Sequence, residues 1–236
     1  MVTVAILTLN EEDRIEAAIR SASFAHEVLV LDSGSTDRTV PRARALGARV
    51  LETDWPGFVA QRMRALDEAR CDSVFFLDAD ETIGRELAAA LADPPPAGRV
   101  MRRNHWLGQP IRAGAFGPSR VTRLCRKNGG VWEGEGVHEV LRPTDTVTDL
   151  PGVLEHHPYR SLDEHHATID RYATLFATHS TRRARWWDIT LRPPLHFVKS
   201  LVLQRGFVDG RAGFSLAWLG SVHVAKKWWR LSRRAR

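Results

Sequence analysis

Two aspartates, Asp78 and Asp80, stand one residue apart where an apolar run ends, in the segment FFLDADE. Mg²⁺ and Mn²⁺ prefer oxygen ligands, and Mg²⁺ is commonly held by one or two carboxylates together with the phosphates of a substrate. The pair therefore predicts a divalent cation site that acts on a diphosphate. An Asp-rich turn between a strand and a helix is also a common helix cap, so the pair alone does not decide between these two interpretations.

The chain contains neither of the two glycine-rich phosphate-binding motifs. Neither GxGxxG nor GxxxxGK[ST] occurs, so neither a dinucleotide-binding fingerprint nor a P-loop explains a phosphate ligand. The remaining possibility is a nucleotide held by polar groups at the ends of strands, with a metal ion neutralising its diphosphate.

Apolar runs bounded by turn residues alternate with helix-period segments through the first hundred residues, the pattern of a parallel sheet covered by helices on both faces. Ligands of such sheets bind beyond the carboxyl ends of the strands. The clusters at residues 8–11, 32–34 and 78–80 follow predicted strands, so we expect them at one edge. Strands are expected at Val2–Leu9, Glu27–Leu31, Arg49–Glu52 and Ser73–Leu77, and helices at Glu11–Ser23 with Asn10 as the cap, Val40–Leu46 and Phe58–Ala69.

Periodicity weakens after the prolines at 94–96. Arg99–Trp106 and Arg120–Cys125 are predicted strands around a loop rich in Gly and Pro, and Leu162–Arg183 is a predicted helix. We therefore expect an α/β domain over residues 1–160 and a helical extension over residues 161–236. The adjacent His165 and His166, at the start of that helix, are expected on the surface.

The composition is that of a folded protein in a reducing compartment. The 236 residues are 43% hydrophobic and 26% charged, which excludes a wholly disordered chain and a collagen-like repeat. Cys71 and Cys125 form neither a disulfide framework nor a metal-binding CxxC, so a cytoplasmic location is expected. The first apolar run is short and lacks a basic lead-in, so it is expected to be a buried strand and not a signal peptide.

Positive charge and tryptophan are concentrated near the C-terminus. Residues 182–236 hold 13 Lys and Arg against 2 Asp and Glu, whereas residues 1–181 hold 21 against 26, and five of the eight tryptophans lie in the basic stretch. Cations mixed with indoles suit lipid headgroups, so a peripheral membrane contact is expected, although Phe214 and Trp218 could also pack a helix onto the sheet domain. The apolar stretches within residues 182–236 are about eleven residues long or shorter, which is too short to span a bilayer. No nucleic-acid partner is expected, because no RNP, helix-turn-helix or zinc pattern accompanies the charge.

Several motifs together resemble a known family. VAILTLNEEDRI, EVLVLDSGSTDRTV, a helix containing Gln61-Arg62, and SVFFLDADE are similar to family 2 glycosyltransferases of the GT-A fold. RNHWLG, the triplet Val137-His138-Glu139 and RGFVDGRAGF resemble the bacterial subgroup that acts on lipopolysaccharide core, typified by heptose-directed glucosyltransferases. The resemblance covers roughly residues 1–225. It implies a GT-A (Rossmann-like), mostly parallel sheet flanked by helices, followed by a basic helical extension.

The resemblance also implies a set of donor-binding residues. Ser33 stands where many relatives carry a second acid, which leaves the contact with the base open. Asp32 matches the acid that contacts the uridine, and Arg62 faces the nucleotide or its phosphates. The matching positions are Thr8, Asn10 and Glu11 for the nucleotide motif of the first strand, Asp78 for the ribose and the metal, Asp80 for the principal metal ligand and His156 for a further metal ligand. His156 could equally be a hydrogen-bonded loop histidine without a metal.

Inverting sugar transfer requires a base that takes the proton of the attacking hydroxyl, and a carboxylate within hydrogen-bond reach can do this. The resemblance puts the acceptor-side acid at Glu139, while Glu133 and Glu135 are local alternatives. His138 could orient Glu139 or contact the sugar.

These observations predict a metal-dependent inverting glycosyltransferase that uses Mg²⁺ or Mn²⁺ and a nucleotide sugar, expected to be a UDP-hexose. The expected acceptor is a lipid-linked saccharide such as an inner-core heptose of lipopolysaccharide, and the expected location is the inner face of the plasma membrane. Two alternatives remain open: transfer to a polyprenyl phosphate, and a non-catalytic protein that binds nucleotide sugars at a membrane surface.

Overall fold

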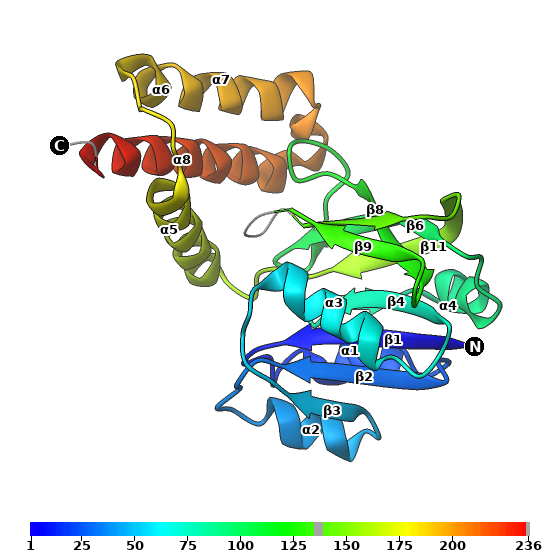
Figure 1. Cartoon of the computed structure of the whole chain (residues 1–236). Coiled ribbons are helices and arrows are strands. Elements are labelled where there is room, and N and C mark those ends of the chain that lie inside the picture. The colour runs from blue at the N-terminus through cyan, green and yellow to red at the C-terminus, as the bar shows by residue number, and fades with distance from the viewer. Residues whose placement is uncertain (135–138, 235–236) are drawn as a thin grey trace. The chain divides into compact units, whose positions relative to one another are not determined.

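The computed structural model describes residues 1–134 and 139–234 of the chain. It divides into two compact units (Figure 1). The sheet unit comprises residues 1–102 and 119–156, and the helical unit comprises residues 103–118 and 157–236. The sequence placed a single boundary near residue 160, whereas the segment 103–118 joins the helical unit although it lies between two strands of the sheet.

Parallel strands form one half of the sheet unit, in the order β3-β2-β1-β4. They are connected by helices, as the alternating pattern of the sequence predicts. The strands are β1 (Val2–Thr8), β2 (Glu27–Asp32), β3 (Arg49–Glu52) and β4 (Ser73–Asp78), and the helices are α1 (Ile15–Ser21), α2 (Thr39–Ala45) and α3 (Phe58–Glu68).

Antiparallel strands complete the sheet beyond β4, in the order β8-β6-β11-β5. These are β8 (Ser119–Arg126), β6 (Gly98–Trp106), β11 (Thr148–His156) and β5 (Glu81–Ile83). Helix α4 (Arg85–Ala92) packs against β11. The short strand β7 (Gln109–Pro110) pairs with the end of β6. A separate hairpin joins β9 (Gly130–Glu133) to β10 (Val140–Pro143). The predicted α/β fold, with a sheet flanked by helices, is confirmed, and parallel pairing is confined to its first four strands.

Both faces of the sheet are buried, which explains the nearly continuous apolar runs of its central strands. Val4 and Ile6 of β1 pack with Ile15 of α1 on one face, where α2 and α4 also contribute. Ala5 points to the opposite face and packs with Leu66 of α3, beside the β9–β10 hairpin. The alternation of side chains along a strand therefore supplies two cores.

Within residues 157–234, five helical segments and one helical turn follow the sheet. They are α5 (Leu162–His179), α6 (Trp186–Thr190), α7 (Arg192–Val198), the π-helical turn η1 (Lys199–Leu203), the 3₁₀ segment η2 (Gly206–Asp209) and α8 (Gly210–Arg234). Helix α8 packs against α5 and α7 (Figure 1). The Asp209 carboxylate accepts hydrogen bonds from the backbone N–H groups of Arg112 and Ala113, which ties the segment 103–118 to these helices. No helix of the described residues is both long and apolar enough to cross a membrane.

Two local predictions are wrong. Asn10 caps no helix, because α1 begins at Ile15; its backbone is left-handed, with φ 56°, and its Oδ1 accepts a hydrogen bond from the Thr36 N–H at 2.8 Å. His165 is not a surface residue. It is 7% exposed, its ring stacks on Tyr159 at 3.8 Å between centroids, and its Nδ1 accepts from Trp106 Nε1 at 3.1 Å.

Candidate active site

The carboxyl ends of three parallel strands bring predicted site residues together. Thr8 at the end of β1 lies opposite Asp32 at the end of β2, and Leu7 lies opposite Asp78 at the end of β4. Residues 24 and 71 positions apart in sequence thus become neighbours at one edge of the sheet. This is the position where open α/β sheets bind ligands.

Asp32 organises the loop that follows β2. Its side chain is buried, and its Oδ2 accepts hydrogen bonds from the backbone N–H groups of Gly34 at 3.0 Å and Ser35 at 2.8 Å. Its Oδ1 accepts from the Ser35 hydroxyl. Gly34 has φ 93°, a conformation that glycine adopts at little cost. The carboxylate therefore fixes a tight turn, and a contact with a base would use its remaining lone pairs.

Asn10 and Glu11 join the loop after β1 to the loop after β2. The Asn10 N–H donates to Ser35 Oγ at 2.8 Å, and the Glu11 N–H donates to Thr39 Oγ1 at 2.8 Å. The Glu11 carboxylate lies 3.3 Å from the Arg14 guanidinium. The TLNEED and DSGSTD motifs thus form one hydrogen-bonded rim, because each loop supplies the bonding partners of the other.

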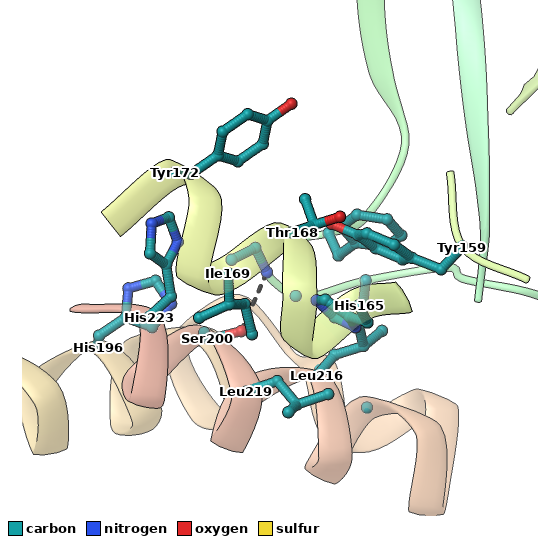
Figure 2. A pocket seen from close by; sticks show the side chains of 17 residues that line it. Tyr159, His165, Thr168, Ile169, Tyr172, His196, Ser200, Leu216, Leu219 and His223 are labelled. Atoms are coloured by element: carbon teal, nitrogen blue, oxygen red, sulfur yellow. Dashed lines mark hydrogen bonds between the residues drawn. The ribbon is translucent and has the colours of Figure 1, made fainter. Parts of the chain in front are cut away.

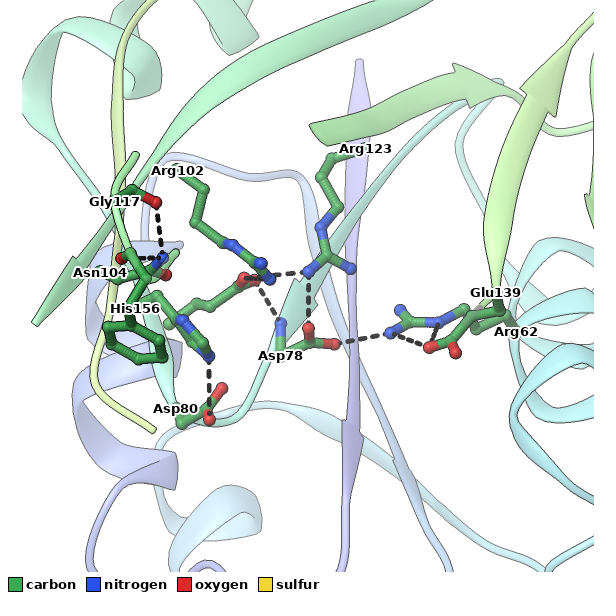
Figure 3. A network of polar contacts seen from close by, with 11 residues as sticks. Arg62, Asp78, Asp80, Arg102, Asn104, Gly117, Arg123, Glu139 and His156 are labelled. Atoms are coloured by element: carbon green, nitrogen blue, oxygen red, sulfur yellow. Dashed lines mark hydrogen bonds and ion pairs between the residues drawn. The ribbon is translucent and has the colours of Figure 1, made fainter. Parts of the chain in front are cut away.

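Asp78 lies at the centre of a buried ionic network (Figure 3). Its Oδ1 accepts from Arg62 Nη2 at 2.8 Å, and its Oδ2 accepts from Arg123 Nη2 at 2.6 Å. Burial raises the pKa of the Asp78 carboxyl, but the guanidinium groups of Arg123 and Arg62 outweigh burial and hold the pKa well below its ordinary value. Asp78 is therefore ionised and bound to two cations, which leaves it less available to a metal ion than the sequence suggested.

Glu81 and Arg123 are members of this network that the sequence analysis did not single out. Glu81 is fully buried; its Oε1 accepts from Arg123 Nη2 at 2.9 Å, and its Oε2 accepts from the Asp78 N–H at 3.0 Å. Burial raises the pKa of Glu81 above its ordinary value, against the opposing effect of Arg123. Burial lowers the pKa of Arg123, but the charges of Asp78 and Glu81 outweigh it and raise the pKa. Glu81 directly follows the DAD motif, so the sequence could have identified it as a site residue. The segment SRVTRLCR contains no motif that identifies Arg123.

Arg62 connects Asp78 to Glu139 (Figure 3). The Arg62 side chain is buried in α3, and its guanidinium lies 4.4 Å from the centroid of the Trp132 ring, a cation–π contact. Its Nε and Nη2 donate to Glu139 Oε1 at 3.3 and 3.2 Å. Asp78 and Glu139, 61 positions apart in sequence, therefore share one cation.

Several buried polar atoms of this site have no hydrogen-bond partner among the described residues. They include Thr8 Oγ1, Gln61 Oε1, Arg62 Nη1 and Glu139 Oε2. Leaving a buried donor or acceptor unsatisfied costs about 1–3 kcal/mol, so such atoms are expected to find partners in a ligand. Their position beyond the ends of the parallel strands indicates a polar ligand there.

Asp80 and His156 form the part of the site that could hold a metal ion. Asp80 Oδ2 lies 3.4 Å from His156 Nε2, and His156 is brought there by the pairing of β11 with β5 (Figure 3). No group of three or more His, Cys, Asp or Glu side chains forms a metal cage within residues 1–134 and 139–234. A carboxylate and an imidazole nonetheless fit Mg²⁺ or Mn²⁺ as a partial ligand set, because such ions are completed by water and substrate phosphates.

A hollow lies at the carboxyl ends of β2 and β3, beside this edge. Its volume is about 390 Å³, and Gly34, Thr53 and Arg64 are among its lining residues. Gln61 is fully buried nearby, and its Nε2 donates to Thr53 Oγ1 at 2.5 Å and to Ser33 Oγ at 3.2 Å. Thr53 and Arg64 were missed because neither belongs to a recognisable motif.

Glu139 is the acceptor-side candidate that the network includes. Glu133 is exposed and lies 3.7 Å from Arg142 across the β9–β10 hairpin. Glu135 and His138 lie outside the described residues. Glu139 thus differs from Glu133 in burial and in its bond to Arg62.

Residues 3–104, which contain the strand-end clusters, match the sequence profile described as Glycosyl transferase family 2. This stretch of the chain is thus similar to family 2 glycosyltransferases. The predicted enzyme class, a glycosyltransferase, is thereby confirmed.

The chain of this glycosyltransferase is similar to one relative well beyond the residues that match the family profile. It is 28% identical over 235 residues to the lipopolysaccharide core biosynthesis glycosyltransferase LpsC of Rhizobium meliloti, covering 93% of this chain and 87% of LpsC. It is 46% identical over 83 residues to an uncharacterized glycosyltransferase of Rickettsia bellii, covering 35% of this chain and 28% of that protein. A solved structure of glucosyl-3-phosphoglycerate synthase from Mycobacterium tuberculosis, in complex with Mn²⁺, UDP-glucose and phosphoglyceric acid, is 32% identical over 44% of each chain, with a TM-score of 0.37.

The glycosyltransferase has a second pocket, which lies wholly within the helical unit (Figure 2). It has a volume of about 150 Å³ and is lined by three histidines, His165, His196 and His223, among residues of α5, α7, η1 and α8. Burial lowers the pKa of His165 and of His223 to about 4, with smaller contributions from neighbouring histidines and, for His223, from Lys227. These imidazoles are therefore neutral at pH 7, and each offers one donor and one acceptor nitrogen.

Proposed function

We propose that this glycosyltransferase moves a hexose, with inversion, from a nucleotide diphosphate sugar to a hydroxyl group of a lipid-linked saccharide. The donor is proposed to be a UDP-sugar and the acceptor a saccharide such as lipopolysaccharide inner core. The observation that carries this proposal is the pair of unpartnered atoms on two buried, mutually bonded side chains, Arg62 Nη1 and Glu139 Oε2. The likeness to LpsC over most of both chains supports the choice of acceptor.

The donor is proposed to bind beyond the ends of β1, β2 and β4. The unpartnered Thr8 Oγ1 and Gln61 Oε1 are available to its hydroxyl and amide groups, and the hollow beside Thr53 has room for a base or a sugar. The Arg62 Nη1 group is available to a phosphate oxygen, with which a guanidinium forms strong charge-assisted hydrogen bonds. The rim formed by Asn10, Glu11 and Asp32 holds these groups in place.

Asp80 and His156 would hold Mg²⁺ or Mn²⁺, which when bound supplies positive charge to the leaving diphosphate. The protein adds to that charge with Arg62, whose neighbours Asp78 and Glu139 fix its orientation. Arg123 binds the opposite oxygen of Asp78 and so keeps Asp78 from turning away. Asp78 is in this proposal a residue that positions Arg62.

Glu139 is proposed to act as the base. Arg62 binds its Oε1, so the carboxylate is held in one orientation while Oε2 remains without a partner among the described residues. The acceptor hydroxyl oxygen forms a bond to the anomeric carbon as the bond from that carbon to the diphosphate oxygen breaks, and the hydroxyl proton passes to Oε2. Attack opposite to the leaving group inverts the anomeric centre without a covalent enzyme intermediate.

A lipid-linked acceptor requires the enzyme to work at a membrane surface, which we propose to be the inner face of the plasma membrane. Two features support this location. Cys71 and Cys125 are free, buried thiols, as is usual in a reducing compartment. The excess of cations over acids in residues 182–236 suits an anionic membrane surface.

The test compares Glu139→Gln with Glu133→Gln, a neighbouring carboxylate outside the network. The substrates are UDP-glucose with Mn²⁺ and a lipid-linked heptose acceptor. We expect Glu139→Gln to lower the turnover rate by about 10²–10⁴-fold, since that is the usual contribution of a general base. UDP-glucose binding should be unchanged, and Glu133→Gln should have near wild-type turnover.

Two results would overturn the proposal. If Glu139→Gln keeps most of its activity towards a polyprenyl phosphate, a phosphate oxygen that needs no strong base is the nucleophile. If the wild-type chain binds UDP-glucose but neither transfers nor hydrolyses it with Mn²⁺, the protein is a non-catalytic binder. If the wild-type chain hydrolyses UDP-glucose and Asp80→Ala does not, the protein is not a non-catalytic binder.

A further inference from the structure

In the basic part of the helical unit, residues 182–236, the acidic side chains are buried and many apolar side chains are exposed. The acidic residues of the stretch 182–236 are Asp188 and Asp209, and they are 4% and 6% exposed. Asp188 bonds to the Arg185 N–H and to the Arg192 guanidinium, and Asp209 bonds to backbone N–H groups of the segment 103–118. The described surface of this stretch therefore carries positive charge only.

One face of α8 carries an exposed aromatic stripe with an arginine near each end. Phe214, Trp218 and Trp229 are 53%, 58% and 45% exposed. With Arg211 and Arg233 they recur at intervals of three, four, eleven and four residues, which places all five on one side of a helix. The Arg233 guanidinium lies 4.2 Å from the centroid of the Trp229 ring, so cation and indole are presented together.

The neighbouring segment α7–η1 carries an exposed aliphatic stripe. Leu195, Val198 and Val202 are 65%, 49% and 53% exposed, at the helical spacing of three and four residues, and Leu191 extends the stripe by a further turn. No residue of α7 is buried. Phe197 of α7 contacts Phe214 of α8 at 5.4 Å between ring centroids, so the two stripes belong to one helical hairpin.

We infer that this hairpin is a membrane-docking surface, whose occupant is the headgroup region of an anionic lipid bilayer. The docking surface consists of the aliphatic stripe of α7–η1 and the aromatic stripe of α8, with the exposed cations Lys199, Arg205, Arg211 and Arg233 around them. Aliphatic side chains suit the acyl boundary, tryptophans suit the interface, and cations attract anionic headgroups. The inference deepens the proposed membrane location, and it rests on the proposed function only in its choice of a lipid surface.

Charge and side-chain type favour lipid over the other possible occupants. A second copy of the chain would bring two surfaces of the same positive sign together, which is unfavourable. Single-stranded nucleic acid binds to aromatic platforms and cations, but the leucines and valines of α7–η1 offer no ring for a base to stack on. A bilayer uses all three kinds of side chain.

The test uses the full chain with phosphatidylcholine vesicles that contain or lack 30% phosphatidylglycerol, without any sugar nucleotide. We expect sedimentation with the anionic vesicles and little with the neutral ones. Trp218→Ser and Leu195→Ser should each lower the partition coefficient by about tenfold, because each removes a large apolar group from the interface. Arg211→Gln should lower it about fivefold for the anionic vesicles.

Matched controls come from the sheet unit. Trp55 is 47% exposed, so Trp55→Ser changes an equally exposed indole, and Arg38→Gln removes an exposed cation. Both controls should bind vesicles as the wild type does. Circular dichroism checks that each variant is folded.

Three outcomes overturn the inference: no binding of the wild type to anionic vesicles, equal binding by Trp218→Ser and the wild type, or sedimentation equilibrium showing a dimer that Trp218→Ser dissociates. The inference is also overturned if the protein prefers a single-stranded oligonucleotide and vesicles do not displace it. Transfer to a detergent-solubilised acceptor, measured on the same samples, separates the two proposals, because it tests catalysis and does not require docking.

Discussion

The two units of this chain depart from the usual partition of residues in opposite directions. The sheet unit buries charge: Glu81 and Arg123 lie inside it, bonded to each other, and Arg123 also binds the partly buried Asp78. The helical unit instead exposes large apolar groups, since it keeps tryptophans such as Trp218 and Trp186 at its surface. Buried ions and clustered exposed apolar groups both cost stability unless they do something else. The contrast therefore separates a site for a small polar ligand from a surface for a large amphipathic one.

The strongest test of the buried charge is Arg123→Met. Loss of the guanidinium leaves Asp78 with one cation and leaves Glu81 without its closest one, and breaking a buried pair in this way costs about 3–5 kcal/mol. We expect the free energy of unfolding, measured by urea denaturation, to fall by that amount.

The control for Arg123→Met is Arg99→Met. Arg99 forms an ion pair with Asp149 at 2.5 Å in the same unit, but the two side chains are each 47% exposed. Exposed pairs contribute about 0–1 kcal/mol, so this variant should lose little stability. Equal losses in the two variants would mean that burial does not distinguish the Asp78 network.

In the helical unit, the largest expected effect comes from acid. His165 has a folded-state pKa of about 4, below the ordinary 6.5, so the unfolded chain binds more protons between these values. Stability is therefore fully present above pH 6.5 and falls as the pH drops towards 4, by up to about 3 kcal/mol from this group.

The contribution of His165 is isolated with His165→Phe, which retains an aromatic ring against Tyr159 but cannot titrate. The free energy of unfolding is measured from pH 7 to pH 4 for both proteins. We expect a shallower pH dependence in the variant. Parallel curves would show that carboxylates and other histidines account for the whole effect.

A smaller loss is expected from Gly213→Ala at the start of α8. Helix propensity alone would favour alanine by about 1 kcal/mol. However, a Cβ at this position would lie 1.8 Å from the Gly206 carbonyl oxygen, a backbone atom, so we expect a net loss of about 1–3 kcal/mol.

Gly220→Ala is the matched substitution in the same helix. There the added Cβ meets the His196 ring, a side chain that can turn aside. Thermal unfolding should show a smaller loss than for Gly213→Ala, and the reverse order would contradict the close approach of η2 to α8.

The smallest expected effect is that of Trp218→Ser on stability. An exposed side chain without such special contacts changes the free energy of unfolding by less than about 0.5 kcal/mol. Denaturation of this variant should coincide with that of the wild type. A loss above about 2 kcal/mol would indicate that Trp218 packs in the fold, and the exposed stripe would then need another explanation.

The sequence was sufficient to predict the parallel half of the sheet and the meeting of its strand ends. Alternating periods place Thr8, Asp32 and Asp78 after strands, and the geometry of a parallel sheet then makes them neighbours. The pairing of Asp78 with Arg123 could not be predicted, because it depends on the register of the antiparallel β8 against β4. Their separation of 45 positions leaves no local pattern.

The two wrong predictions also result from contacts between residues that are distant in sequence. Asn10 has the side chain of a helix cap, but its partner is Thr36 in the next loop, so a tertiary contact replaces the local one. His165 stands in a polar stretch, yet Trp106 and Tyr159 enclose it. The roles of the predicted site residues remain predictions, although the structure gathers many of them at one edge of the sheet.

The path of the chain between its units limits how evolution or engineering can recombine them. The polypeptide passes from one unit to the other after residues 102, 118 and 156. A crossover placed only near residue 157 would join new helices to an old segment 103–118, and Asp209 would no longer meet the backbone of Arg112 and Ala113 for which it is positioned. Chimeras with altered acceptor preference should therefore exchange residues 103–118 and 157–236 as a pair.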